Sequence, residues 1–384
     1  MFKYAGIFLA GLMLAVAGCS STAPNKSGGA IPAGWSANGG STLPPPPPAP
    51  THPQATPVPR HVLPPSTNGN EPGLHFNPLP PVPRPPVTVP TTTWSALSRW
   101  ATANGTEQPH RIATSPVVSY AIGSSYGVLV LNIGSRDATW NGITIHLGFA
   151  PEMVDDEVFV HGLDLEKNLE PLLCEAPEPV PAEPGRTVVL DPGHGGRDTG
   201  TISVLDGLPE KTFTLDLAKR LQPLLEARGW RVYLTRTVDM DFALSNRVSF
   251  AIAHHADLFV SLHFNSSAPE HKQAGLETYC MTPVGMPSTL TRGYQDIVSR
   301  VFPVNLYDSG SLRLALRLHS AILRATEEED RGVRRARFLG VSQGQKCPAV
   351  LIEGGYLSNP AEARLIESGT YRQKLAVAIA GALR

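Results

Sequence analysis

Residues 186–196 read RTVVLDPGHGG, a β-branched run that ends in a glycine-rich turn bearing His194. After Glu210, apolar residues recur every three to four positions as far as about Gly229, which predicts an amphipathic helix. Strands and helices then alternate to the end of the chain, with strands at 231–235, 257–262, 275–281 and 349–352 and helices at 244–254, 312–325, 361–367 and 371–383. This alternation predicts a three-layer α/β domain over residues 186–384, with a mostly parallel sheet and helices on both faces.

Four polar side chains stand at the ends of these elements. His194, His263 and Glu353 each follow an apolar strand, and Glu210 opens a helix. Because the ligand crevice of an open parallel sheet lies outside the carboxyl ends of its strands, we expect the four to converge. His194, His263 and Glu210 would form an open catalytic zinc site, and Glu353 would act as general base and then acid. We expect Asp191 to accept an N–H from a ligand imidazole.

Each of these residues also has a purely structural interpretation. Glu210 alone is a favourable anion at a helix N-terminus, and His263 could be a satisfied core histidine. Glu353 could pair with Arg247 or Arg334. The structural interpretation requires four separate coincidences, so we favour the zinc site.

Four blocks of this region resemble the signature blocks of the zinc-dependent N-acetylmuramoyl-L-alanine amidases of type 3: DPGHGG, PEKTFTLDLAKRL, SLHFNS and PAVLIEGGYLSNPAEARLI. They occur in the family's order between residues 186 and 384. The resemblance implies that His194, Glu210 and His263 bind Zn²⁺ and that Glu353 is the catalytic carboxylate. It also implies hydrolysis of the amide bond between N-acetylmuramic acid and L-alanine in peptidoglycan, for wall remodelling, daughter-cell separation or turnover.

Two other functions share parts of this pattern. A non-catalytic module could bind peptidoglycan and anchor it to the outer membrane, but such modules usually lose a ligand or the catalytic glutamate. A zinc carboxypeptidase or endopeptidase acting on the stem peptide would use the same chemistry on a different bond. Retention of all four residues favours a hydrolase.

The N-terminus predicts export and lipidation. Residues 1–19 contain Lys3, an apolar run too short to span a bilayer comfortably, and small residues up to Cys19. The end of this segment resembles the lipobox of bacterial lipoproteins, in which the cysteine is lipidated; the alternative is an ordinary signal peptide with an incidental Cys19. Ser20 in place of aspartate implies an outer-membrane anchor, and we expect a periplasmic, lipid-anchored protein.

Composition divides the rest of the chain before residue 186. Residues 20–93 are rich in proline and almost free of charge and aromatics, which predicts a disordered tether; ~50 residues of polyproline II would extend on the order of 150 Å. Residues 94–175 predict a small β-rich domain with a helix over 159–173, loosely resembling the copper-amine-oxidase N-terminal-like domain. Residues 176–185 alternate proline with glutamate and predict a linker.

The charge and cysteine content of the chain limit the kinds of molecule and bond that it can form partners with. The formal net charge of -1 and the lack of an Arg/Lys stripe exclude nucleic acid. The odd set Cys174, Cys280 and Cys347 leaves the disulfide state open. We expect a monomer. Some members of the amidase family carry an inserted helix that blocks the zinc until a partner protein moves it, and the resemblance implies partial autoinhibition here by a helix near 294–302, between two site-bearing strands. The charged run at 327–336 is interpreted most simply as a solvated face after a helix; the alternative, which the resemblance implies, is an Arg-Gly-Val turn in contact with the cleft.

Overall fold

The computed structural model describes residues 93–174 and 185–383. The segment 1–19 with Cys19, the proline-rich segment up to residue 92 and the linker residues 176–184 lie outside the described residues. Within the described part, no helix combines the length and the apolar character needed to cross a membrane.

The C-terminal part of the chain is built on a mixed sheet with the strand order β10-β9-β11-β14-β12-β13. Its strands are β9 (Thr187–Pro192), β10 (Arg231–Leu234), β11 (Leu258–Asn265), β12 (Leu276–Cys280), β13 (Asp330–Arg335) and β14 (Ala349–Tyr356). All neighbouring pairs are parallel except β12 with β14. The central strands β9, β11 and β14 are buried almost throughout, as strands covered on both faces must be.

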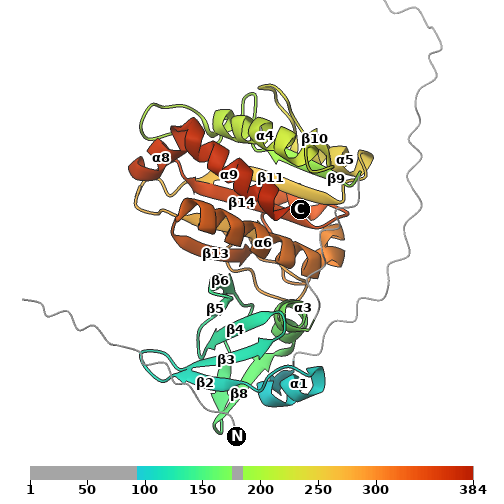
Figure 1. The fold of residues 1–384 in the computed structure, drawn as a ribbon, viewed down its shortest axis with the longest axis vertical. Helices are drawn as coiled ribbons and strands as arrows, with labels where there is room; N and C mark the ends of the chain where they lie inside the picture. The colour runs from blue at the N-terminus through green and yellow to red at the C-terminus, as the bar shows by residue number, and fades with distance from the viewer. Residues whose placement is uncertain (1–92, 175–184, 384) are drawn as a thin grey trace, which may run out of the picture. The chain divides into compact units, whose positions relative to one another are not determined.

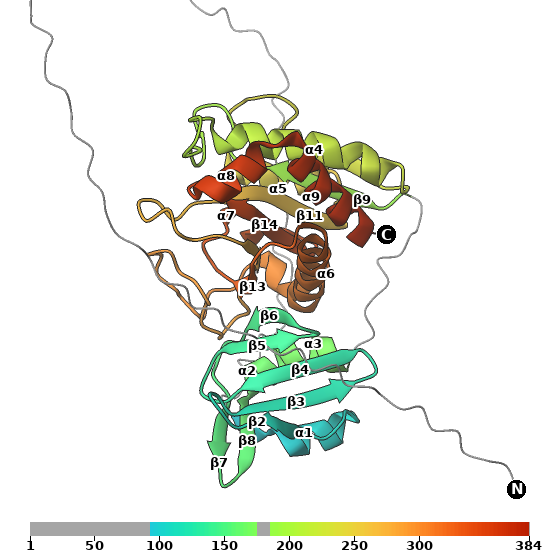
Figure 2. The same ribbon diagram turned by 60° about the vertical axis from the view of Figure 1, so that its left-hand side comes forward.

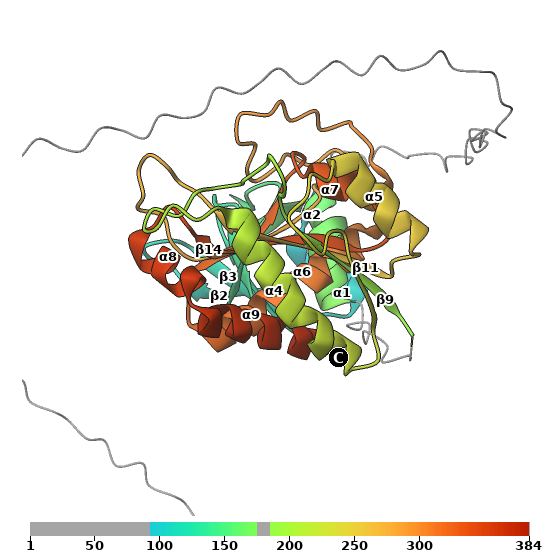
Figure 3. The ribbon, with the colours of Figure 1, turned by 90° about the horizontal axis from the view of Figure 1, so that it is seen from above.

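Helices cover both faces of this sheet, as the sequence predicts. On one side lie α4 (Glu210–Glu226), α6 (Asp308–Thr326) and α9 (Gly369–Ala382), with α8 (Pro360–Glu367) beside α9 (Figure 1). On the other side lie α5 (Leu244–Ala253) and the short α7 (Gly340–Gln343), which contact each other (Figure 3). The predicted three-layer α/β architecture is therefore confirmed.

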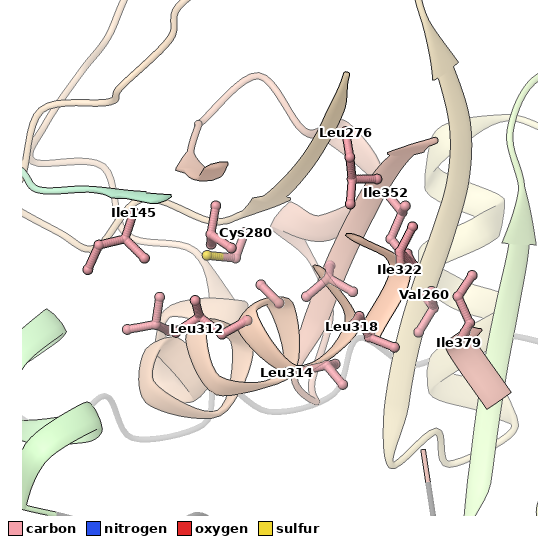
Figure 4. Close-up of a cluster of buried hydrophobic side chains, with 14 of the residues drawn as sticks. Ile145, Val260, Leu276, Cys280, Leu312, Leu314, Leu318, Ile322, Ile352 and Ile379 are labelled. Carbon is pink, nitrogen blue, oxygen red and sulfur yellow. The ribbon is translucent and has the colours of Figure 1, made fainter. Parts of the chain in front are cut away.

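The interior between α6 and the sheet is apolar. Leu312, Leu318 and Ile322 of α6 face Leu276 and Cys280 of β12, as Figure 4 shows. Full burial of each such side chain stabilises the fold by about 1.5–3 kcal/mol relative to exposure. Cys280 and Cys347 are buried free thiols.

The part before the linker is rich in strands. An antiparallel run pairs β2 (His110–Ala113), β3 (Ser119–Ser124), β4 (Gly127–Asn132), β5 (Asp137–Trp140) and β6 (Ile143–His146) in that order (Figure 2). Asn141 and Gly142 both have positive φ and join β5 to β6 as a two-residue hairpin turn. A second sheet pairs β1 (Trp94–Ala96), β8 (Glu157–His161) and β7 (Glu152–Val154), next to α1 (Leu97–Asn104).

The helical segment after β8 begins later than predicted. Phe159 belongs to β8, and the helical turns run from α2 (Gly162–Asp164) through a π-helical stretch (Leu165–Leu169) to α3 (Glu170–Leu173). The boundary moved because residues 159–161 pair with β1 in the second sheet. The domain limits at 94–175 and 186–384 stay a prediction, and the strand β6 pairs with β13 in one continuous sheet.

The prediction of a solvated face at residues 327–336 was wrong, because most of this run is the strand β13. Its charged side chains find polar partners inside the protein: Arg331 Nε lies 2.9 Å from Glu277 Oε1. Arg335 is 1% exposed and donates to the side-chain oxygen of Asn168 at 3.0 Å. A charged sequence can form an interior strand when each charge meets a partner from elsewhere in the chain, and periodicity alone does not reveal such partners.

Candidate active site

Three adjacent strands deliver the predicted site residues to one edge of the sheet. His263 lies near the end of β11, directly opposite Glu353 of β14 in the parallel register. On the other side of β11, β9 ends at Pro192, and His194 follows in the glycine turn. Glu210 is the first residue of α4. The four residues therefore lie together at the carboxyl ends of the strands, as we expected.

His194, Glu210 and His263 form a cluster that could hold a metal ion, with one ligand atom from each within 4.8 Å of the others. The Nε2 atom of His194 lies 3.1 Å from Glu210 Oε2, and the Nδ1 atom of His263 lies 3.0 Å from Glu210 Oε1. Two imidazoles and one carboxylate match the donor set of open catalytic zinc sites. These three residues therefore fit the zinc ion that the sequence predicts.

The electrostatics of the cluster favour a cation at its centre. Glu210 is 2% exposed; burial alone would raise its pKa, but the hydrogen bonds and charges of His194 and His263 hold that pKa well below its usual range. Burial alone would lower the pKa of His194, but Glu210 and then Asp198 raise it to about 9. A buried carboxylate that stays ionised needs positive charge beside it, which a bound divalent cation would supply.

Asp198, and not Asp191, orients an imidazole of the cluster. Its Oδ1 atom lies 2.9 Å from Nδ1 of His194, which leaves Nε2 facing Glu210. Our expectation for Asp191 was wrong, since its carboxylate accepts hydrogen bonds from Thr235, Ser261 and Arg247. Asp191 lies within β9, where successive side chains point to opposite faces of the sheet. Its carboxylate therefore faces these three partners and not the imidazoles of the cluster. One feature of the sequence could have identified Asp198: it is a carboxylate in the same turn, four residues after His194.

Buried arginines hold the turn that carries His194. Arg247 of α5 donates to the carboxylate of Asp191 at 2.6 Å and to the backbone oxygen of His194 at 2.7 Å. Arg236 donates to the backbone oxygen of Gly193 at 2.8 Å. His194 itself has φ +62, a left-handed conformation that is costly for a residue with a side chain. The two guanidinium groups fix the turn in this conformation.

Two glycines permit the close packing of the cluster. A Cβ at Gly193 would lie 2.2 Å from Cε1 of His263, and a Cβ at Gly200 would lie 2.6 Å from Oε2 of Glu210. Real Cβ atoms essentially never come that close. Only glycine therefore allows these backbone segments to touch the ring and the carboxylate.

Glu353 is a buried carboxyl group with one oxygen left over. It is 5% exposed, and its Oε2 has no hydrogen-bond partner among the described residues. Burial, with the charges of Glu210 and Glu277, raises the pKa of Glu353 to about 7, although His263 and Arg292 act in the opposite direction. A carboxyl group with a pKa near the working pH is suited to both accepting and releasing a proton.

The structural interpretations of Glu353 as a partner of Arg247 or Arg334 do not hold. Arg247 pairs with Asp191, and Nε of Arg334 lies 3.3 Å from Glu277. The nearest guanidinium to Glu353 is Arg292, whose Nη2 lies 3.7 Å from Oε1.

Arg292 comes from the segment between β12 and α6, where we expected a helix. Residues 294–302 form no helix; the segment runs as a loop and enters one 3₁₀ turn at Pro303–Tyr307 before α6. The expectation failed because Asp296 is drawn inward by Arg337, whose Nη1 donates to it at 2.5 Å, and this contact competes with a regular helix. The idea of a blocking helix loses its basis, and the segment instead places Arg292 at the site.

The cluster, Glu353 and Arg292 open into one cleft of about 530 Å³. Its lining combines the polar centre with an apolar wall, which includes Leu244, Phe338, Leu339, Val341 and Leu351. Asn265 and Ser266 also line it, whereas Asn359 caps α8 by accepting from the backbone of Ala361. A cleft of this size, apolar with convergent polar groups, is typical of an enzyme active site.

Comparison with known proteins places this arrangement in a family. The sequence model of the amidase family described as N-acetylmuramoyl-L-alanine amidase matches residues 188–384 of the 384 in the chain. N-acetylmuramoyl-L-alanine amidase AmiA of Escherichia coli K12 is 32% identical over 216 residues, which cover 51% of this chain and 74% of AmiA.

A second relative matches more of the chain. N-acetylmuramoyl-L-alanine amidase AmiC of Neisseria meningitidis is 30% identical over 278 residues, 62% of this chain and 66% of that protein. Among solved structures, the catalytic domain of the amidase CwlV from Bacillus (Paenibacillus) polymyxa has 31% identity, covers 51% of this chain and 95% of its own, and has a TM-score of 0.43. Because the family model spans just over half of the chain and AmiA is matched over 74% of its length, the chain belongs to the N-acetylmuramoyl-L-alanine amidase family.

Proposed function

We propose that this protein is a zinc-dependent hydrolase that cleaves the amide bond between N-acetylmuramic acid and L-alanine in peptidoglycan. The family supplies the bond, and the site supports the chemistry. The observation that carries the proposal is the cluster of His194, Glu210 and His263 in one cleft with Glu353, whose Oε2 has no hydrogen-bond partner among the described residues.

His194, Glu210 and His263 would hold the zinc ion through two imidazole nitrogens and one carboxylate. Bound zinc would polarise the scissile carbonyl and lower the pKa of the attacking water. Glu353 accepts a proton from that water while the oxygen of the water bonds to the lactyl carbonyl carbon. The same carboxyl group then returns the proton to the alanine nitrogen as the C–N bond breaks, which leaves a carboxylic acid on the sugar and a free amine on the peptide. General acid–base catalysis of this kind contributes typically ~100- to 10,000-fold.

We further propose that the chain acts at the cell wall from a lipid anchor on Cys19, in the periplasm and at the outer membrane. The lipobox-like segment and the proline-rich segment after it support this placement. A periplasmic, peptidoglycan-facing role agrees with the family. Control by an activator protein and a monomeric state both stay predictions.

A paired measurement tests the enzymatic proposal. The full-length chain is purified in detergent, its zinc is measured by elemental analysis, and muropeptide release from purified sacculi is followed by mass spectrometry. The same measurements are made on Glu353→Ala and on the control Glu226→Ala, which changes an exposed glutamate at the end of α4.

We expect about one zinc per chain in all three proteins. The wild type and the control should release stem peptides with a free N-terminal alanine, and Glu353→Ala should release none. Stem peptides shortened at another bond would favour the carboxypeptidase or endopeptidase alternative. Binding to sacculi without cleavage by any of the three proteins would favour the non-catalytic anchor.

A further inference from the structure

The cleft has an uneven distribution of charge. Among the described residues that line it, Asp198, Glu210 and Glu353 are acidic, and Arg292 is the sole guanidinium or ammonium group. The three acidic groups belong to the metal cluster or to the reacting centre. Arg292 is therefore the one fixed cation available there for a negatively charged part of a substrate.

Arg292 is held in place by its surroundings. Its Nη2 donates to Oδ1 of Asn265 at 3.0 Å, and its guanidinium carbon lies 5.0 Å from the ring centre of Phe338 and 5.6 Å from that of Tyr279. Asn265 is fixed in turn, because its Nδ2 donates to Glu277 at 2.9 Å. The aromatic contacts and the hydrogen bond orient the planar group before any ligand arrives.

The Arg292 side chain still reaches solvent within the cleft. It is 38% exposed, compared with 7% for the side chain of Glu353. A guanidinium has five N–H donors in a fixed fork and can bind a carboxylate through two of them at once. The 3.7 Å separation from Glu353 is too long for a hydrogen bond, so this pair does not use that capacity.

The position of Arg292 sets which part of a substrate it can reach. A general acid lies about 3 Å from the nitrogen that it protonates, and Nη2 of Arg292 lies 3.7 Å from Glu353. The guanidinium is thus at most about 7 Å from a nitrogen that takes its proton from Oε1 of Glu353, and two residues of extended peptide span at most ~7 Å. The second residue of the stem peptide therefore comes within reach of Arg292.

We propose that Arg292 binds the free α-carboxylate on the second residue of the stem peptide, an isoglutamate, and so makes the enzyme prefer that carboxylate over a carboxamide. This inference rests on the proposed amidase function. A carboxamide keeps the shape of the carboxylate but lacks its charge, and a charge-assisted hydrogen bond is about twice as strong as a neutral one.

The test uses two muropeptides that differ only at this group, one with the α-carboxylate and one with the α-carboxamide. The full-length wild type is compared with Arg292→Gln and with Arg300→Gln. Arg300 is a matched control, because it lies on the same segment and contacts Phe302 at 5.6 Å but does not line the cleft. Zinc content and thermal midpoint are measured for each protein.

The wild type and Arg300→Gln should cleave the carboxylate form with a kcat/KM about 10- to 100-fold higher than the carboxamide form. In Arg292→Gln this ratio should fall to about one, with most of the change in KM and with unchanged zinc content. Calorimetry with the released peptides should show the same loss of preference in Kd, independently of turnover.

Two results would overturn the inference. Arg292→Gln could keep the wild-type ratio, or it could lower cleavage of both substrates equally, which would mean that Arg292 acts only on Glu353. Failure of the amidase proposal looks different: the wild type would then cleave neither muropeptide.

Discussion

Replacing Gly193 by alanine displaces a predicted zinc ligand without altering that ligand. The added Cβ would lie 2.2 Å from Cε1 of His263, and ordinary van der Waals contact begins at 3.4 Å, so the ring must move by about 1.2 Å. The backbone cannot yield instead, because N of Gly193 donates to Leu262 at 3.0 Å and its O accepts from Thr214 at 2.9 Å and from Arg236 at 2.8 Å.

A zinc site tolerates ligand displacements of only about 0.2 Å. Loss of an outer hydrogen bond to a ligand already costs 10- to 100-fold in metal affinity, so we expect Gly193→Ala to weaken zinc binding by at least ~100-fold. Competition with a chromophoric chelator measures the affinity, and circular dichroism checks the fold. Gly381→Ala is the control, because a Cβ on that residue of α9 meets nothing within 4 Å.

The control should bind zinc as the wild type does. If Gly193→Ala binds zinc within about threefold of the wild type, then either His263 is not a ligand or the turn can move in spite of its three hydrogen bonds. Either conclusion would refute the reasoning from the geometry.

Four further outcomes follow from the same structure. Glu353 must be ionised to accept a proton, and burial with the charges of Glu210 and Glu277 raises its pKa to about 7, so kcat/KM should fall as the pH drops through the pKa of Glu353. The positive charge of bound zinc should lower that pKa and place the acid limb of the profile below pH 7. Arg292 lowers the pKa of Glu353 and Glu277 raises it. The acid limb should therefore move to higher pH in Arg292→Gln and to lower pH in Glu277→Gln. A shift in the same direction for both variants would contradict the assignment of the acid limb to Glu353. Asp191→Asn leaves Arg247 buried without its counter-charge, which should lower the free energy of unfolding by about 3–5 kcal/mol in urea titrations; a loss below ~1 kcal/mol would mean that the pair is not important for the turn. Removal of zinc by a chelator should lower the thermal midpoint, and added zinc should restore it, because the metal binds the folded state.

The sequence was sufficient to predict most of the catalytic half of the fold. The strand before His194, the helix after Glu210 and the strand leading to His263 each carry a clear local pattern, and the structure has them at nearly the predicted positions. The four residues could be grouped because parallel strands bring their carboxyl ends to one edge.

Two of the errors share one cause, which is that charged residues found partners far away in the sequence. The strand β13 looked like a solvated face because the pairing of Arg331 with Glu277 joins residues that are 54 positions apart. The expected helix at 294–302 is absent where Asp296 meets Arg337. Patterns of period two or 3.6 report local burial and contain no information on such pairs.

The sequence by itself determined which elements form and which side chains reach the carboxyl edge of the sheet, because strand and helix periodicity are local properties of the chain. Only the tertiary structure decided which aspartate orients His194, which guanidinium stands beside Glu353 and which glycines must lack a side chain. Asp198 and Asp191 are equally good acceptors in sequence, but one faces the cluster and the other faces Arg247. Those roles depend on distances of a few ångströms between separate elements, and they are fixed only when the elements pack.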